Sequence, residues 1–262
     1  MTRFSIEWAA FVTATRKELL QQARTKRLLI IVAVFVLFGL TSPLLAKFTP
    51  ELLGSIPGAE QFADLIPEPS IADALAQYIK NLTQFGFILA VLLGMGAVAG
   101  EKERGTAAMI LSKPLPRWAF LLSKFVSQVA VYVLALGIAA LGAYYYTFIL
   151  FGPVDVGSFV LLNLLLLLWL LTFVAVTLLG SVLGKSTSAA GGIGLGGAVL
   201  LLLAGSLPKV GSLAPGGLVT WASQLGAGVD PVDPNGGAVA MALVIILLSL
   251  TGALAAFEAQ EI

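Results

Sequence analysis

The chain has 262 residues, of which 58% are hydrophobic and 11% are charged, and its formal net charge is +1. A soluble domain is about 45–50% apolar and about 25% charged, so a soluble globular fold could not bury this much apolar surface. Cysteine and histidine are both absent, which excludes disulfides, a thiol nucleophile, histidine acid–base chemistry and zinc sites built from these residues.

Residues 5–24 precede the first long apolar run, and their pattern predicts an amphipathic helix lying at the membrane interface. The polar side of this helix carries Arg16, Lys17 and Gln21. The alternative is a plain cytoplasmic extension of the first span. The apolar members of the predicted helix are Ile6, Trp8, Phe11, Val12 and Leu19.

Long apolar runs dominate the rest of the chain. A helix of roughly 20 apolar residues crosses a hydrocarbon core of about 30 Å, so each run predicts a transmembrane helix. The prediction is an all-α integral membrane protein with six transmembrane helices in a single domain, 1–262. We expect the first run to be an uncleaved span, because the region ahead of it is too long for a signal peptide. The runs lie at about 28–46, 82–100, 120–151, 158–184, 189–207 and 237–257.

The distribution of Lys and Arg predicts the orientation. With both termini in the cytoplasm, twelve of these residues lie inside and only Lys47, Lys80 and Lys209 lie outside. The positive-inside rule therefore favours a multi-pass protein of the cell (plasma or inner) membrane with cytoplasmic termini. Lys124 is the one charge within the runs, and we expect its long side chain to snorkel to the near interface.

Helix signals also occur between the spans. Thr49 ahead of a proline resembles a helix N-cap, and Ser70 with Asp73 resembles a capping box that leads into the second span. Trp221 is expected to anchor a loop at the interface. Neither outer segment is large enough to form an independent domain. These outer segments are 48–79 and 208–235.

Two nucleotide-like motifs fail their structural test. Gly192, Gly194 and Gly197 fit G-x-G-x-x-G, but they lie inside an apolar span rather than after a strand, so close helix packing explains them better. Residues 184–187 read Gly-Lys-Ser-Thr, yet the first glycine of a P-loop would fall at Leu179. We expect a short turn there and no nucleotide binding.

The segment between the second and third spans, 100–117, is the densest charge cluster in the chain. Thr106 is positioned to cap a short helix from Ala107 to about Ser112, which Pro114 stops. This pattern predicts a small amphiphilic helix that projects into the cytoplasm. The alternative is a solvated charged loop that only obeys the positive-inside rule.

The segment resembles the cytoplasmic loop of type-2 ATP-binding cassette (ABC) transporter permeases, whose pattern runs G-E-[KR]-E-x-G-T, then L-S-x-P, then R and a downstream K. The N-terminal helix and six spans agree with the same family, whereas the tail after Phe257 lacks the basic residues that such permeases often carry. The matching residues are Gly100, Glu101, Lys102, Glu103, Gly105, Thr106, Leu111, Ser112, Pro114, Arg117 and Lys124.

The resemblance implies a permease subunit that holds no cofactor and no metal, and that pairs with a separate ATPase subunit, which binds Mg-ATP. It also implies a second permease copy, identical or paralogous, a setting of membrane lipids, and no nucleic acid. In such permeases the loop is a coupling helix that docks on the ATPase. The implied coupling residues are Glu101, Lys102, Glu103, Arg104, Gly105, Thr106, Met109, Ile110, Leu111 and Lys113.

The leading hypothesis is therefore an exporter permease without enzymatic activity of its own. Its uncharged spans accommodate a lipidic or amphiphilic substrate more easily than a bare ion. The alternative is a mechanical relay that transmits ATPase motion to an extracytoplasmic protein without moving a solute. An intramembrane enzyme is disfavoured, because the spans offer only scattered polar side chains, of which Asn163 and Gln128 are the clearest.

Overall fold

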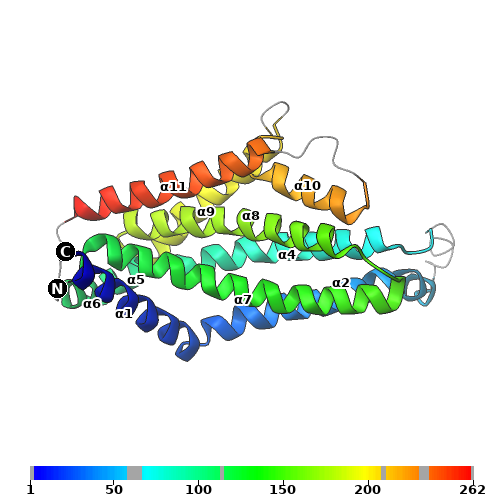
Figure 1. Ribbon diagram of the computed structural model, residues 1–262, viewed down its shortest axis with the longest axis horizontal. Helices are drawn as coiled ribbons and strands as arrows, with labels where there is room; N and C mark the ends of the chain where they lie inside the picture. The colour runs from blue at the N-terminus through cyan, green and yellow to red at the C-terminus, as the bar shows by residue number, and fades with distance from the viewer. Residues whose placement is uncertain (1–2, 58–66, 113–114, 208–210, 230–235, 261–262) are drawn as a thin grey trace.

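A computed structural model describes residues 3–57, 67–112, 115–207, 211–229 and 236–260. These residues form helices and no strands. The long helices run side by side along the longest axis, and both termini lie at the same end (Figure 1). The helices are α1 (Arg3–Arg24), α2 (Arg27–Gly54), α4 (Ile71–Gly94), α5 (Ala99–Glu103), α6 (Thr106–Leu111), α7 (Arg117–Phe151), α8 (Val156–Leu183), α9 (Thr187–Gly205), α10 (Gly216–Gly226) and α11 (Gly236–Glu258).

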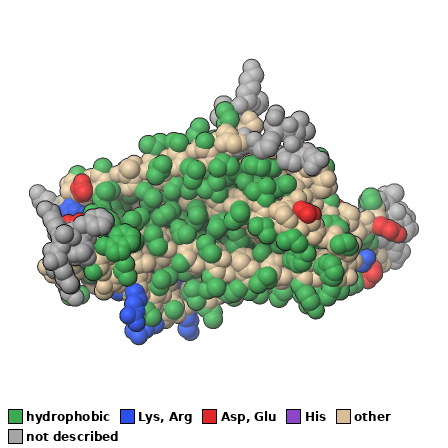
Figure 2. Space-filling model, viewed as in Figure 1, with side chains coloured by type: hydrophobic (Ala, Val, Ile, Leu, Met, Phe, Trp, Pro, Cys, Tyr) green, Lys and Arg blue, Asp and Glu red, His purple; other side chains and the backbone are tan. Residues whose placement is uncertain are grey.

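Six of the described helical segments are long and apolar enough to span a membrane, which confirms the predicted fold class. The second one runs from Ile71 to Glu103 and joins α4 to α5. Figure 2 shows hydrophobic side chains covering the middle of one face, while most of the visible Lys and Arg side chains lie in the half that holds the termini. This arrangement matches a bundle whose sides contact lipid.

Helix α8 forms the centre of the bundle. In its most apolar 18-residue stretch 56% of the residues are buried, against 17% in the corresponding stretch of α9. Glycines let its neighbours approach: a Cβ on Gly180 would lie 2.9 Å from the backbone nitrogen of Gly194. Gly194 therefore serves helix packing, as expected. Gly192 and Gly196 on the same helix are exposed and face open space.

Several predicted boundaries need correction. Helix α2 continues to Gly54, so Thr49 lies inside it and caps nothing. The Thr49 hydroxyl instead donates to the Leu45 carbonyl, and the helix continues past Pro50 because one proline removes only one backbone hydrogen bond. The segment around Trp221 is not a loop but the helix α10.

Other local predictions are confirmed. Ser70 and Asp73 form the predicted capping box at the start of α4. Residues 184–186 form a short turn, in which the Ser186 hydroxyl accepts a hydrogen bond from the Ala189 N–H and caps α9. The Gly-Lys-Ser-Thr sequence thus ends one helix and begins another.

Candidate functional site

The segment after α4 folds as a helical hairpin, formed by α5 and α6. Gly105 joins the two short helices with φ of 69°, a left-handed conformation that glycine adopts without strain. The N-cap of α6 is Gly105 and not Thr106, because the left-handed turn starts the helix one residue earlier than predicted. The Thr106 hydroxyl instead donates to the Glu101 carbonyl, 3.1 Å away, and ties α6 to α5.

A backbone break separates α4 from α5, and α8 stabilises it. The Ser181 hydroxyl accepts hydrogen bonds from the backbone N–H groups of Val98 and Ala99, at 2.9 and 3.0 Å. The same hydroxyl donates to the Met95 carbonyl at 2.7 Å. All three backbone groups belong to the non-helical stretch or its edge, so one serine replaces the hydrogen bonds that the break removes.

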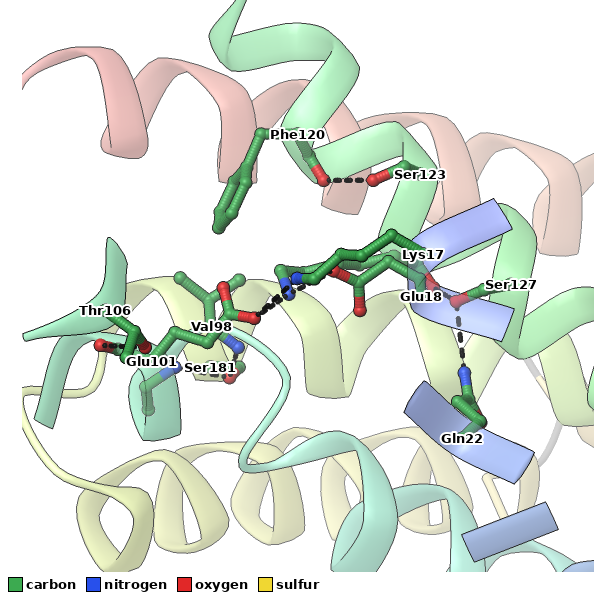
Figure 3. A network of polar contacts seen from close by, with 12 residues as sticks. Lys17, Glu18, Gln22, Val98, Glu101, Thr106, Phe120, Ser123, Ser127 and Ser181 are labelled. Carbon is green, nitrogen blue, oxygen red and sulfur yellow. Dashed lines mark hydrogen bonds and ion pairs between the residues drawn. The ribbon is translucent and has the colours of Figure 1, made fainter. Parts of the chain in front are cut away.

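Helices α1, α5 and α7 meet in a cluster of four charged side chains. We call it the charge cluster, and its members are Lys17, Glu18, Glu101 and Lys124. Lys124 of α7 is only 2% exposed, and its ammonium lies 2.9 Å from Glu101 and 3.1 Å from Glu18. Lys17 contacts the same two carboxylates, at 2.7 Å for Glu18 and 3.3 Å for Glu101. Figure 3 shows Lys17 and Glu18 reaching from α1 toward Glu101.

Mutual pairing makes this burial tolerable. A charge taken out of water without a partner is costly, so each buried ion here depends on the others. Burial alone would raise the pKa of Glu18, but the charge of Lys124 and the hydrogen bond from Lys17 outweigh it and lower that pKa. Burial alone would lower the pKa of Lys17, yet Glu18 and Glu101 together raise it. The Glu18 carboxylate and the Lys17 ammonium are therefore both charged near neutral pH.

One oxygen of the cluster is unused. Glu101 Oε2 is buried and has no hydrogen-bond partner among the described residues, and the same holds for the hydroxyl of Tyr132. Both residues line a cavity of about 30 Å³, together with Lys124 and Gln128. A polar cavity of this size has room for about one water molecule.

Helix α1 packs on α7 through more than charge. The Gln22 amide donates to the Ser127 hydroxyl at 3.0 Å, and the ring of Phe11 lies 5.8 Å from that of Trp118. Phe11 therefore packs on α7, whereas Trp8 and Val12 remain more than half exposed. The exposed apolar strip is compatible with the predicted interfacial position, which stays a prediction.

The C-terminal end of the chain also contacts the hairpin region. The Arg117 guanidinium donates to the carbonyls of Phe257, Glu258 and Gln260, at 2.6, 2.9 and 3.1 Å, and so caps the end of α11. The Lys102 ammonium donates to the Val182 carbonyl at 2.6 Å and to the Gln260 side chain at 3.2 Å. Two basic residues of the segment thus bind backbone and amide oxygens within the chain.

The predicted coupling residues divide into three groups. Glu101 is buried, and Lys102 and Thr106 are partly buried and bonded within the chain. Glu103, Arg104, Gly105 and Met109 are exposed, although Glu103 also accepts hydrogen bonds from the Thr187 backbone and hydroxyl. Ile110 is half-buried against a core cluster that includes Phe120 and Phe257. The Leu111 side chain and Lys113 lie outside the described part.

The sequence predicted a coupling role for Glu101 but not the charge cluster itself. It placed Lys17 only on the polar side of α1, did not single out Glu18 and put Lys124 at the interface. Lys124 does not snorkel to the interface; it is buried among carboxylates, with its ammonium 4.7 Å from the centre of the Phe120 ring. A lysine inside an apolar span needs a counter-ion, and this requirement could have predicted a carboxylate partner for Lys124 from the sequence. Glu18 is the one carboxylate in the C-terminal half of α1, so it was identifiable as a partner.

Together these observations define a polytopic helical membrane protein whose hairpin, N-terminal helix and C-terminal end converge at one end of the bundle. A family model described as "ABC-2 family transporter protein" matches residues 12–215, and the chain belongs to this family. Membership implies a permease-type membrane subunit, a class that is typically not enzymatic, and an ABC ATPase as its partner.

Two bacterial membrane proteins are similar to this chain. The chain is 27% identical to the uncharacterized transmembrane protein YxlG of Bacillus subtilis over 184 residues, which cover 69% of this chain and 70% of that protein. It is 32% identical to the probable ABC transporter permease protein NosY of Pseudomonas aeruginosa over 123 residues. That match covers 47% of this chain and 40% of the relative.

Proposed function

We propose that this chain is the transmembrane subunit of an ABC exporter, coupling ATP hydrolysis by a separate ATPase subunit to movement of a substrate across the membrane. Mg-ATP binds to the ATPase, and this chain contributes no nucleotide site. The chain lies in the plasma membrane with its termini and the α5–α6 hairpin in the cytoplasm. The shared position of the termini and the hairpin at one end of the bundle supports this orientation (Figure 1).

The charge cluster is the observation that carries the proposal. Thr106 joins α6 to α5, and Glu101 joins α5 to Lys124 on α7. Because Lys124 and Glu101 are buried and paired, displacing the hairpin alone would separate charges in a poorly solvated site. A push on the hairpin is therefore transmitted to α1 and to the 35-residue span α7 rather than absorbed locally.

The ATPase contacts the exposed residues of the hairpin, and the buried ones transmit the movement. Met109 is 65% exposed at the surface of α6, which makes it an apolar anchor for a partner. A groove of about 510 Å³ lies beside it, and its lining includes Lys102, Lys185 and the small residues Gly105, Ala107 and Ala108. Glu101 acts in this proposal through Lys124 and not by touching the ATPase.

The test is co-expression with a candidate ATPase subunit, followed by copurification and an ATPase assay. Met109→Asp places a charge at the proposed anchor. We expect the affinity for the ATPase to fall about thirty-fold, the effect of losing a buried hot spot of roughly 2 kcal/mol, and recovery of the complex to fall with it. Val229→Asp is the matched control, since Val229 is 54% exposed after α10.

Equal recovery of the complex with Met109→Asp and Val229→Asp would remove the docking assignment. Normal recovery combined with unchanged ATPase activity in Glu101→Gln would remove the transmission assignment. The relay alternative, in which an extracytoplasmic protein receives the movement, remains a prediction to be decided by what copurifies on the opposite face.

A further inference from the structure

A second feature lies in the half of the bundle away from the termini. A groove of about 500 Å³ opens between α4, α8, α9 and α10. We call it the α4–α10 groove. Its floor is aromatic: the ring centres of Trp169 and Phe173 are 4.5 Å apart, and those of Phe87 and Phe173 are 5.9 Å apart. This floor suits an acyl chain or another apolar group.

The rim of the α4–α10 groove is polar on the α4 side. Lys80 and Gln84 are exposed there, one helical turn apart, and so they lie on the same face of α4. Neither side chain makes a hydrogen bond or an ion pair with the part of the chain that the structure describes. An ammonium and an amide N–H₂ are therefore both free to donate to an anion.

Lys80 contrasts with Lys124. Both lie in helices that are long and apolar enough to span a membrane. Lys124 has two carboxylate partners, whereas Lys80 has none among the described residues. A cation without a counter-ion at the membrane surface attracts anionic headgroups. A groove of similar size, about 470 Å³ between α7 and α8, is lined by apolar side chains with Tyr144 and Asn163 and has no charged residue.

We propose that the α4–α10 groove binds a lipid with an anionic headgroup, with its acyl chain over Trp169 and its headgroup on Lys80 and Gln84. This proposal names the substrate class of the exporter and in that respect rests on the proposed function. In the proposed orientation the groove faces the outer half of the membrane. The apolar groove between α7 and α8 offers no cation to an anionic headgroup, so it is not expected to discriminate between lipids.

Trp169 provides a reporter for this site. The full-length chain carrying Trp8→Phe, Trp118→Phe and Trp221→Phe keeps Trp169 as its single tryptophan. Reconstituted in phosphatidylcholine vesicles, it is titrated with brominated phosphatidylglycerol or brominated phosphatidylcholine, which quench nearby tryptophan fluorescence. We expect the anionic lipid to quench at about five-fold lower mole fraction, the effect of one favourable charge at the membrane surface.

Three variants test the assignment to Lys80. Lys80→Gln should abolish the difference between the two lipids, and Lys80→Arg should keep it. Lys47→Gln is the matched control, because it removes another lysine from the half of the bundle away from the termini, over the ring of Phe151 and outside the groove, and it should keep the preference. If the tryptophan replacements unfold the chain, the phosphatidylglycerol copurified with the wild-type and Lys80→Gln chains gives the same comparison.

The proposal is overturned by equal quenching from the two lipids or by an equal loss of preference in Lys47→Gln and Lys80→Gln. It is also overturned if neither lipid quenches Trp169, as would occur if a second copy of the chain covered the groove. No ATPase is present in this experiment. Its failure therefore removes the substrate class and leaves the coupling proposal standing, whereas failure of the Met109 test leaves a lipid preference unaffected.

Discussion

Lys124 illustrates how one residue depends on its surroundings. Within its own helix it is a charge in an apolar run, and only the approach of α1 and α5 makes its position tolerable. Lys17, which is nearly half exposed, adds a second cation that is partly screened by water. The buried part of the cluster is therefore the Lys124 pairings with Glu18 and Glu101.

Removing the buried cation should destabilise the chain. Lys124→Met leaves Glu18 and Glu101 with Lys17 alone, and breaking a buried pair in this way costs about 3–5 kcal/mol. The double variant Lys124→Met, Glu101→Gln should lose less, because it also removes a buried anion. Thermal unfolding in detergent measures both. An equal or larger loss in the double variant would show that pairing with Glu101 is not what stabilises the cluster.

The lowered pKa of Glu18 predicts a dependence on acid. A carboxylate with a lower pKa in the folded state stabilises the fold above its ordinary value of 4.5, and that contribution is lost as the pH falls through the folded pKa. Lys17 has a raised pKa, so its contribution is fully present below its ordinary value of 10.5 and adds no slope in acid. The stability difference between wild type and Glu18→Gln should thus be largest near pH 7.

The unfolding midpoints of wild type and Glu18→Gln should converge as the pH falls below 4.5. Other carboxylates titrate in the same range, and comparison of the two chains at each pH cancels their effect. A stability difference that stays constant as the pH falls from 7 to well below 4.5 would contradict the assigned ionisation of Glu18.

At the scale of elements, the hairpin is held from two sides. Ser181 on α8 supports the break before α5, while Arg117 and Lys102 bind the residues at the C-terminal end of α11 and just after it. Short helices of five and six residues have little stability of their own, so these tertiary contacts decide where they form. The hairpin is consequently part of the bundle and not an appended loop.

Ser181→Ala should loosen the α4–α5 break. It leaves two backbone N–H groups and one carbonyl without their partner, at a cost of about 1–3 kcal/mol. Hydrogen exchange of Val98 and Ala99 should accelerate. Ser123→Ala is the control, because that buried hydroxyl donates only to the Phe120 carbonyl of its own helix. Equal exchange of Val98 and Ala99 in both variants would show that Ser181 does not stabilise the break.

For the whole molecule, the uneven burial of the spans predicts where the second copy that the family resemblance implies would bind. Helix α8 is enclosed by its neighbours, whereas α9 buries only Ala190, Gly194 and Ala198. Its exposed face carries Gly192 and Gly196, one turn apart, with Ile193 and Leu200 also exposed. Small residues at this spacing permit close helix pairing in a membrane, so we expect the second copy to pack on α9.

Gly196→Leu should reduce dimerisation without unfolding the chain, since an added Cβ at this position meets nothing within 4 Å. We expect the dimer fraction in detergent to fall about five-fold or more, the effect of losing roughly 1 kcal/mol of helix packing. Gly137→Leu is the control, because Gly137 on α7 also faces open space. An unchanged dimer fraction in Gly196→Leu, or an equal fall in both variants, would place the second copy elsewhere.

The sequence by itself determined the six spans, the capping box at Ser70 and the family, because these depend on hydrophobic runs and local motifs. Only the tertiary structure decided that α2 continues past Thr49, that Trp221 lies in a helix, and that Gly105 rather than Thr106 caps α6. It also decided the environment of Lys124, whose partners lie 106 and 23 residues away in the chain. Such pairings depend on which helix faces meet, and a local pattern does not contain that information.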